Sequence, residues 1–404
     1  PAEDLKLESN FQIKYPRLWS PDSANLYKIQ STIEKNGEVL DIVTNDYGFR
    51  YLSTSSQNGL KLNGKPIKLK AVCLHHDQGA LGAADHHRAI LRQVLIMKDM
   101  GANAIRVTHN PASSKLIDIA NRYGILLIEE IFDGWIMDKN NDYNDYSRFF
   151  DKKIGPSHLL NSKEEMTWAE YDLKETLRRD YNSPAIIAYS LGNELMCGTN
   201  QSKRKEYLKI AKNLIAWARE IDQKRFLTIG DNSLRDGYDP VLLEIEEEIT
   251  KSKGLVGLNY CYDEKYEQIH KDYPNWILWQ SESASSINSR ACYDRLGGDL
   301  RDDFRLTSFD DSKVAWGNLA AESWYDVINR DFLMGEAIWT GFDYLGEPTP
   351  YNAIARGFPY GKNAPRSSFF GLVDTAGFAK DSYYFYRAQW NDKDTTTHIL
   401  PSWN

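Results

Sequence analysis

Several features are scarce in this 404-residue sequence, and each scarcity excludes a class of protein. No apolar run approaches the ~18–20 residues that a transmembrane helix needs. The 4 cysteines show no C-x-x-C spacing, which argues against a disulfide scaffold and a zinc site. Lys and Arg number 49 against 57 Asp and Glu, with no long basic block, so we expect neither a nucleic-acid nor a membrane partner.

The first residues have neither the basic nor the apolar region of a signal peptide. The sequence also begins with Pro1 rather than Met, so we expect it to derive from a longer or processed chain, and it assigns no cellular compartment.

Residues 1–56 have the pattern of β-strands. Residues 26–33 and 39–43 are predicted strands joined by an Asn36-Gly37 turn, and residues 47–51 are predicted to form a further strand. So few strands cannot close a sandwich, and the segment is therefore interpreted as part of a β-sandwich.

From residue 57 to residue 404, apolar runs alternate with helical patterns. Continuous apolar runs are typical of parallel strands that are covered on both faces. The runs are residues 69–74, 104–108, 125–131, 185–191, 226–229, 255–259, 277–280 and 334–340. The sequence thus predicts an α/β fold, a (β/α)8 TIM barrel preceded by the partial β-sandwich. A doubly wound sheet is the alternative, but its G-x-G-x-x-G fingerprint is absent.

The residues that follow these runs are rich in carboxylates, amides and aromatic rings, a lining that suits a neutral polyol. Glu194 follows the fourth run and Glu282 follows the seventh. In a closed barrel these strand ends meet at one mouth. Two carboxylates at about 5–5.5 Å are what retaining glycoside hydrolysis requires. The alternative is that either glutamate is an ordinary polar residue at a strand end.

Several separated motifs resemble glycoside hydrolase family 2. They are residues 179–184 (RDYNSP), 191–195 (LGNEL) and 103–111 (NAIRVTHNP). Residues 338–348 (IWTGFDYLGEP), 371–378 (GLVDTAGF) and 399–404 (ILPSWN) resemble the β-galactosidases of that family.

The resemblance implies roles for individual residues. Glu194 would be the general acid/base, and Asn193 would hold the 2-hydroxyl of the sugar. Glu282 would be the nucleophile. Arg106 and Tyr260 would hydrogen-bond the nucleophile and keep it ionised.

Three further residues are predicted to bind substrate. The resemblance implies that His109 lines the sugar site and that Trp339 forms its stacking floor. Asp231, at a strand end, is suited to bind a distal hydroxyl. Structural alternatives stay open, namely a histidine held by backbone groups and a tryptophan that only packs in the core.

The predicted function is therefore that of a retaining β-galactosidase that uses no cofactor and no metal. The alternatives are a β-glucuronidase or β-mannosidase of the same family, or a non-catalytic carbohydrate-binding barrel. A structural alternative for Arg106 is an ion pair with Glu129 or Glu130.

Family members carry a jelly-roll domain and an immunoglobulin-like sandwich before the barrel. Residues 1–56 match only the closing strands of that sandwich. Its exposed strand edges predict a possible homo-oligomer.

Overall fold

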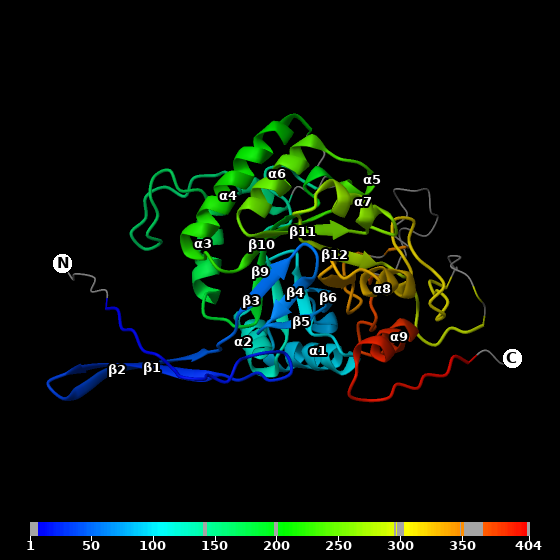
Figure 1. Cartoon of the computed structure of the whole chain (residues 1–404), viewed down its shortest axis with the longest axis horizontal. Helices are drawn as coiled ribbons and strands as arrows, with labels where there is room; N and C mark the ends of the chain where they lie inside the picture. Colours follow the sequence, from blue (N-terminus) through cyan, green and yellow to red (C-terminus); the bar gives the residue numbers. More distant parts are fainter. Residues whose placement is uncertain are drawn as a thin grey trace.

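The computed structural model describes residues 7–139, 144–197, 201–294, 296, 303–347, 349–350 and 367–401. Its centre is a closed barrel in which the hydrogen-bonded order is β10-β11-β12-β13-β6-β7-β8-β9 (Figure 1). The barrel strands are β6 (Leu69–His75), β7 (Ala104–Thr108), β8 (Leu126–Glu130), β9 (Ile186–Asn193), β10 (Phe226–Asp231), β11 (Gly254–Asn259), β12 (Leu278–Ala284) and β13 (Gly335–Trp339). All eight predicted runs are barrel strands, so the predicted TIM barrel is confirmed.

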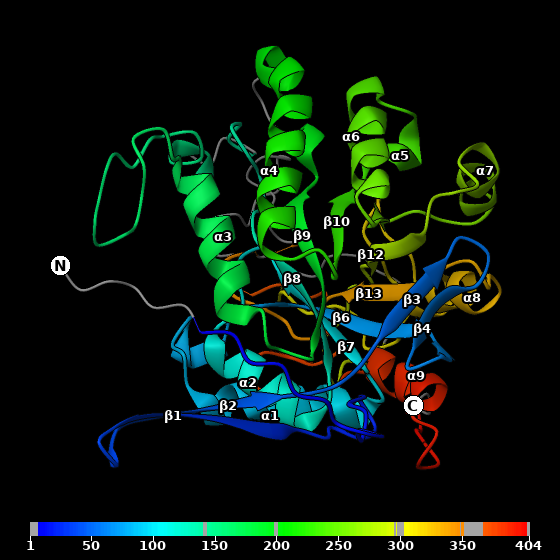
Figure 2. The same ribbon diagram turned by 60° about the vertical axis from the view of Figure 1, so that its left-hand side comes forward.

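Helices surround the barrel on its outside (Figure 2). They are α1 (His87–Met100), α2 (Ser114–Tyr123), α3 (Trp168–Asp180), α4 (Tyr207–Ile221), α5 (Ser233–Asp236), α6 (Pro240–Lys251), α7 (Lys265–Asp272), α8 (Ala320–Ile328) and α9 (Asp381–Trp390). Helix α1 illustrates why they lie there, because Ile90, Val94 and Met97 recur at helical spacing and are buried against the barrel. It ends at Gly101, whose φ of 99° favours glycine.

The N-terminal segment forms two small antiparallel sheets. Strands β1 (Tyr27–Lys35) and β2 (Glu38–Tyr47) make a ribbon that projects from one side of the barrel (Figure 1). Strands β3 (Leu52–Ser55), β4 (Gly59–Leu62) and β5 (Lys65–Ile67) make a three-stranded sheet that spans the predicted boundary at residues 56/57. Because this sheet includes residues on both sides of 56/57, it does not mark a domain boundary there, and the predicted boundary stays a prediction.

The predicted strand over residues 47–51 is wrong. Strand β2 ends at Tyr47, and Gly48 and Arg50 turn toward the barrel instead. A Cβ on Gly48 would lie 2.7 Å from the Pro184 side chain, and Arg50 Nε donates to the Pro184 carbonyl at 2.5 Å. These contacts take the place of the backbone hydrogen bonds to a neighbouring strand that residues 48–51 would need in order to form a β-strand.

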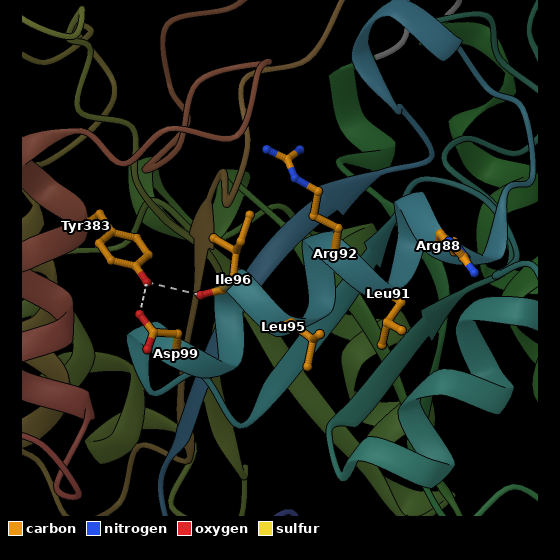
Figure 3. Close-up of a pocket in the computed structure, with 7 residues that line it drawn as sticks. All are labelled: Arg88, Leu91, Arg92, Leu95, Ile96, Asp99 and Tyr383. Atoms are coloured by element: carbon orange, nitrogen blue, oxygen red, sulfur yellow. Dashed lines mark hydrogen bonds between the residues drawn. The ribbon is translucent and has the colours of Figure 1, made fainter.

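Two observations concern the outside of the molecule. No helix among the described residues is both long and apolar enough to cross a membrane. A shallow hollow on the exposed side of α1 includes Leu91 and Leu95 and is closed at one end by Tyr383 of α9 (Figure 3). The Tyr383 hydroxyl bonds to the Asp99 carboxylate at 2.8 Å, which ties α9 to α1.

Pro348 and residues 402–404, which belong to the family-like motifs, lie outside the described residues.

Candidate active site

Glu282 lies in β12 and is held from two sides. The residue is only 3 % exposed, and Oε1 accepts a hydrogen bond from Arg106 Nη1 at 2.7 Å. The Tyr260 hydroxyl also bonds to this carboxylate, while the Tyr260 backbone N–H donates to the Glu282 carbonyl at 2.7 Å. Burial raises the pKa of Glu282, and Arg106 opposes that rise. The predicted partners of Glu282 are thus both in contact with it.

Arg106, in β7, is fully buried between two carboxylates. Besides Glu282, it binds Glu130 Oε2 through Nη2 at 2.7 Å, and the same nitrogen donates to Asn193 Oδ1 at 2.9 Å. Burial alone would lower the pKa of Arg106, but Glu130 and Glu282 raise it well above its usual value. Arg106 therefore makes the predicted contact with Glu282 and the alternative structural ion pair, with Glu130 rather than Glu129, at once.

Glu194 follows β9 and is linked to Glu282 by a continuous polar path. Asn259 Nδ2 donates to Glu194 Oε1 at 3.1 Å and to Asn193 Oδ1 at 3.0 Å. Asn193 Oδ1 in turn accepts from Arg106, which binds Glu282. The backbone N–H of Glu194 donates to the Gly230 carbonyl at 2.7 Å. The ends of β7, β9, β11 and β12 thereby bring both predicted catalytic carboxylates into one network.

His109 and Trp339 form one wall of this site. Their rings stack with centroids 5.3 Å apart and planes 17° from parallel. His109 Nδ1 lies 2.5 Å from Glu130 Oε1, and Nε2 lies 3.8 Å from Glu282 Oε1. Burial would lower the pKa of His109, but Asp133 and Glu130 together raise it. One face of Trp339 is thus covered by the imidazole, and its role as a stacking floor for sugar stays a prediction.

Asp231, at the end of β10, has a different local environment. Its buried carboxylate accepts from the backbone N–H groups of Ser233 at 2.7 Å and Leu234 at 2.9 Å, and from the Ser233 hydroxyl. Burial raises the pKa of Asp231 to about 7, against the effect of these bonds. The side chain stabilises the first turn of α5, so its proposed bond to a sugar hydroxyl stays untested.

Two central residues were not among the predicted site residues: Glu130, which was considered only as a structural ion-pair partner of Arg106, and Asn259. Glu130 bonds to Arg106, to His109 and to the Ser190 hydroxyl, the last at 2.8 Å. Asn259 joins Glu194 to Asn193. Both are polar residues at the ends of apolar runs, and that position was the available signal.

His109, Glu130 and Asp133 have ligand atoms within 4.8 Å of one another, the spacing of a metal site. However, Arg106 is bonded to Glu130, and Lys139 Nζ is bonded to Asp133 at 2.6 Å. These cations already balance the carboxylates, and the group therefore fits an ion-pair network better than a metal site.

Comparison with known proteins identifies the barrel. The profile of the TIM barrel domain of glycosyl hydrolases family 2 matches residues 55–376, and a second profile of the family matches residues 2–50. The chain belongs to glycosyl hydrolases family 2. The predicted family is therefore confirmed. Members of this family are retaining glycosidases.

Individual relatives in the family carry different sugar names. A β-galactosidase of Bacteroides ovatus is 32% identical over all of this chain and 48% of its own length. A β-glucuronidase of Bacteroides fragilis is 27% identical over 96% of this chain and 51% of its own length. The crystal structure of a β-glycosidase from Bacteroides vulgatus superimposes with a TM-score of 0.73 at 29% identity, covering 94% of this chain and 46% of that one. The chain thus spans about half the length of these relatives.

Proposed function

We propose that this chain carries the active site of a retaining β-galactosidase. The observation that supports the proposal most strongly is the network that joins Glu282 to Glu194 through Arg106, Asn193 and Asn259. An ionised nucleophile needs a fixed cation, which Arg106 supplies. A general acid needs a position at the same mouth, and Glu194 has one.

The reaction takes two displacements. In the first, a carboxylate oxygen of Glu282 attacks the anomeric carbon while Glu194 gives its proton to the departing glycosidic oxygen. A covalent glycosyl-enzyme forms and the aglycone leaves. In the second, Glu194 takes a proton from water, the water oxygen attacks the anomeric carbon, and Glu282 is released as a carboxylate.

The charges around the site favour a neutral sugar over a glucuronide. The carboxylate at C6 of a glucuronide would require a cation that is not already neutralised. Arg106 binds Glu130 and Glu282, Lys139 binds Asp133, and Lys203 donates to the Ile136 carbonyl at 3.1 Å. The buried Lys380 is bonded to Asp343 at 2.6 Å. The 32% identity to a relative named β-galactosidase points the same way.

The test compares dinitrophenyl β-galactoside, β-glucoside, β-mannoside and β-glucuronide as substrates. We expect turnover of the galactoside with β-galactose as the first product by NMR. Glu282→Gln should lose roughly 1000-fold or more of this activity, because no glycosyl-enzyme can form. Glu194→Gln should release a burst of one equivalent of dinitrophenol and then slow down, because this leaving group needs no proton but the second step needs a base. Glu244→Gln, on the exposed side of α6, is the matched control.

Other results would contradict the proposal in distinct ways. Preferred turnover of the glucuronide would assign the chain to its β-glucuronidase relatives. An α-configured first product would exclude the retaining mechanism. Sugar binding by the unaltered chain without turnover of any substrate would support a carbohydrate-binding barrel instead.

A further inference from the structure

A polar cavity lies at the end of the barrel opposite the candidate active site. It has a volume of about 270 Å³ and is bounded on one side by the segment between β2 and β3, including Arg50. The rest of its lining comes from residues 181–184, 222, 224, 225 and 253, which lie just before β9, β10 and β11. The cavity, here called the Arg50 pocket, therefore lies at the amino ends of the strands.

The Arg50 pocket contains more positive charge than its own carboxylate can balance. Arg50, Lys224, Arg225 and Lys253 line it, and Asp222 is the acidic residue among the lining residues. Asp222 is already engaged, because Oδ2 accepts from Arg225 Nη1 at 2.5 Å and Oδ1 accepts from the backbone N–H groups of Lys224 and Arg225. This excess is local, since the whole chain has a net charge of −8.

The guanidinium of Arg50 is held in place by carbonyl groups. It donates to the carbonyls of Pro184 and Ile186, and Arg225 Nε donates to the same Ile186 carbonyl at 2.9 Å. None of the ion pairs among the described residues includes Arg50, and the acidic residue of the pocket, Asp222, pairs with Arg225 instead. Burial, as the larger cause, and the neighbouring Arg225 lower the pKa of Arg50 to about 9, while Asp222 opposes this shift.

We propose that the Arg50 pocket binds a tetrahedral oxyanion, phosphate or sulfate. All three nitrogens of Arg225 donate to protein acceptors, and so do Nε and Nη2 of Arg50. Arg50 Nη1 makes none of these bonds and would donate to the anion, while the lysines at the rim add charge without directional demands. The anion would balance the repulsion between Arg50 and Arg225. Because the pocket joins the β2–β3 segment to the barrel, the bound anion would also fasten that segment to residues 181–184.

The test measures thermal unfolding of the chain with phosphate or sulfate at up to 10 mM, with sodium chloride holding the ionic strength constant. We expect either oxyanion to raise Tm by about 2 °C along a saturating curve, because an anion that binds only the folded state stabilises it. The two arms establish which oxyanion is preferred, and saturation by either one supports the site. Titration calorimetry of phosphate or sulfate into the chain gives the affinity directly.

The variants remove charge without disturbing the bonds of Arg50 to the backbone. Lys224→Ala with Lys253→Ala changes two exposed side chains, and we expect it to weaken oxyanion affinity roughly tenfold. Lys271→Ala, on exposed α7, is the control and should respond like the unaltered chain. The proposal would be overturned by no shift with either oxyanion, by an equal shift with chloride, or by the same affinity in the double variant. A linear, unsaturated rise in all variants would also overturn it, because it would indicate general exclusion of the salt from the surface.

Discussion

At the scale of single residues, Glu130 controls the charges around the proposed nucleophile without touching it. Its two oxygens accept from Arg106, His109 and Ser190. Both oxygens of the Glu130 carboxylate are therefore engaged by these partners. Glu130 is therefore a positioning residue, which fixes Arg106 against Glu282 and favours the protonated form of His109.

Glu130→Gln should lower kcat/KM roughly tenfold, because charge-assisted bonds to Arg106 and His109 become weaker. It should also lower the pH at which the His109 imidazole loses its proton, because Glu130 is one of the groups that raise the pKa of His109. The measurements are kcat/KM at one pH and the pH titration of the His109 ring signals by NMR.

The control for this prediction is Glu244→Gln, an exposed change of the same kind, which should leave both quantities unchanged. Equal kcat/KM and an equal His109 titration in Glu130→Gln and the unaltered chain would show that Glu130 has only a packing role.

The two proposed catalytic glutamates could be predicted from sequence, but the network between them could not. Glu194 and Glu282 stand directly after or within apolar runs, where barrel geometry alone directs attention. Asn259 is also at a strand end, yet its partners Glu194 and Asn193 are 65 and 66 residues away in sequence. Only the closed order of the strands brings them together.

At the scale of elements, strand β10 shows how the barrel leaves room for this network. A Cβ on Gly230 would lie 2.8 Å from both Arg106 Nη2 and Asn193 Oδ1. Gly230→Ala should therefore displace these groups and lower kcat/KM about 10-fold to 100-fold. The measurement is steady-state kinetics on the sugar that the chain prefers.

Gly237→Ala is the matched control for this prediction. A Cβ there would meet nothing within 4 Å, so its kinetics should remain unchanged. Equal kinetics for Gly230→Ala and the unaltered chain would show that the network does not depend on the space at β10.

The contact between β13, β12 and α8 predicts a pH effect on stability. Glu336 is fully buried, and its Oε2 accepts from the hydroxyls of Ser283 at 2.6 Å and Ser323 at 3.1 Å. Burial raises the pKa of Glu336 to about 8. A folded state with the higher pKa holds its proton longer than the unfolded state, so stability falls as pH rises from about 4.5 toward 8.

Glu336→Gln removes this titration. We expect its free energy of unfolding to fall less than that of the unaltered chain between pH 5 and pH 9, by about 4 kcal/mol. Urea unfolding at both pH values measures the difference. Glu244→Gln, an exposed change of the same kind, should leave the pH dependence as it is. Parallel curves for Glu336→Gln and the unaltered chain would exclude this source of pH dependence.

The element that sequence reasoning placed wrongly, residues 47–51, fails for a reason found only in three dimensions. Its residues have strand propensity. The carbonyls of Pro184 and Ile186, more than 130 positions away, bind Arg50 instead. The local sequence pattern does not predict these hydrogen bonds to residues that are distant in the sequence.

At the scale of the whole molecule, the two ends of the barrel carry opposite chemistry. The carboxyl ends of the strands hold the acidic candidate active site around Glu194 and Glu282. The amino ends hold the cationic Arg50 pocket, next to the segment that leads to the β1–β2 ribbon. A ligand at the amino end would therefore act on the attachment of the N-terminal sheets rather than on the proposed reaction.

The β1–β2 ribbon predicts self-association of the chain. Its two strands pair only with each other among the described residues, which leaves both outer edges open. One face carries the exposed side chains of Ile33 and Val43, at 59 % and 48 % exposure. We expect a dimer at micromolar concentration that dissociates on dilution, measured by light scattering after size-exclusion chromatography.

Paired variants on the two faces of the ribbon test how it associates. Ile33→Lys with Val43→Lys places two charges on the apolar face and should weaken the dimer about tenfold or more. Gln30→Lys with Thr44→Lys adds the same charge to the opposite face, because Gln30 is paired with Thr44 in the register. That control should still dimerise. Because all four side chains are exposed, neither pair should lower Tm appreciably. A monomer at every concentration, or equal loss of the dimer in both pairs, would show that the apolar face does not drive association.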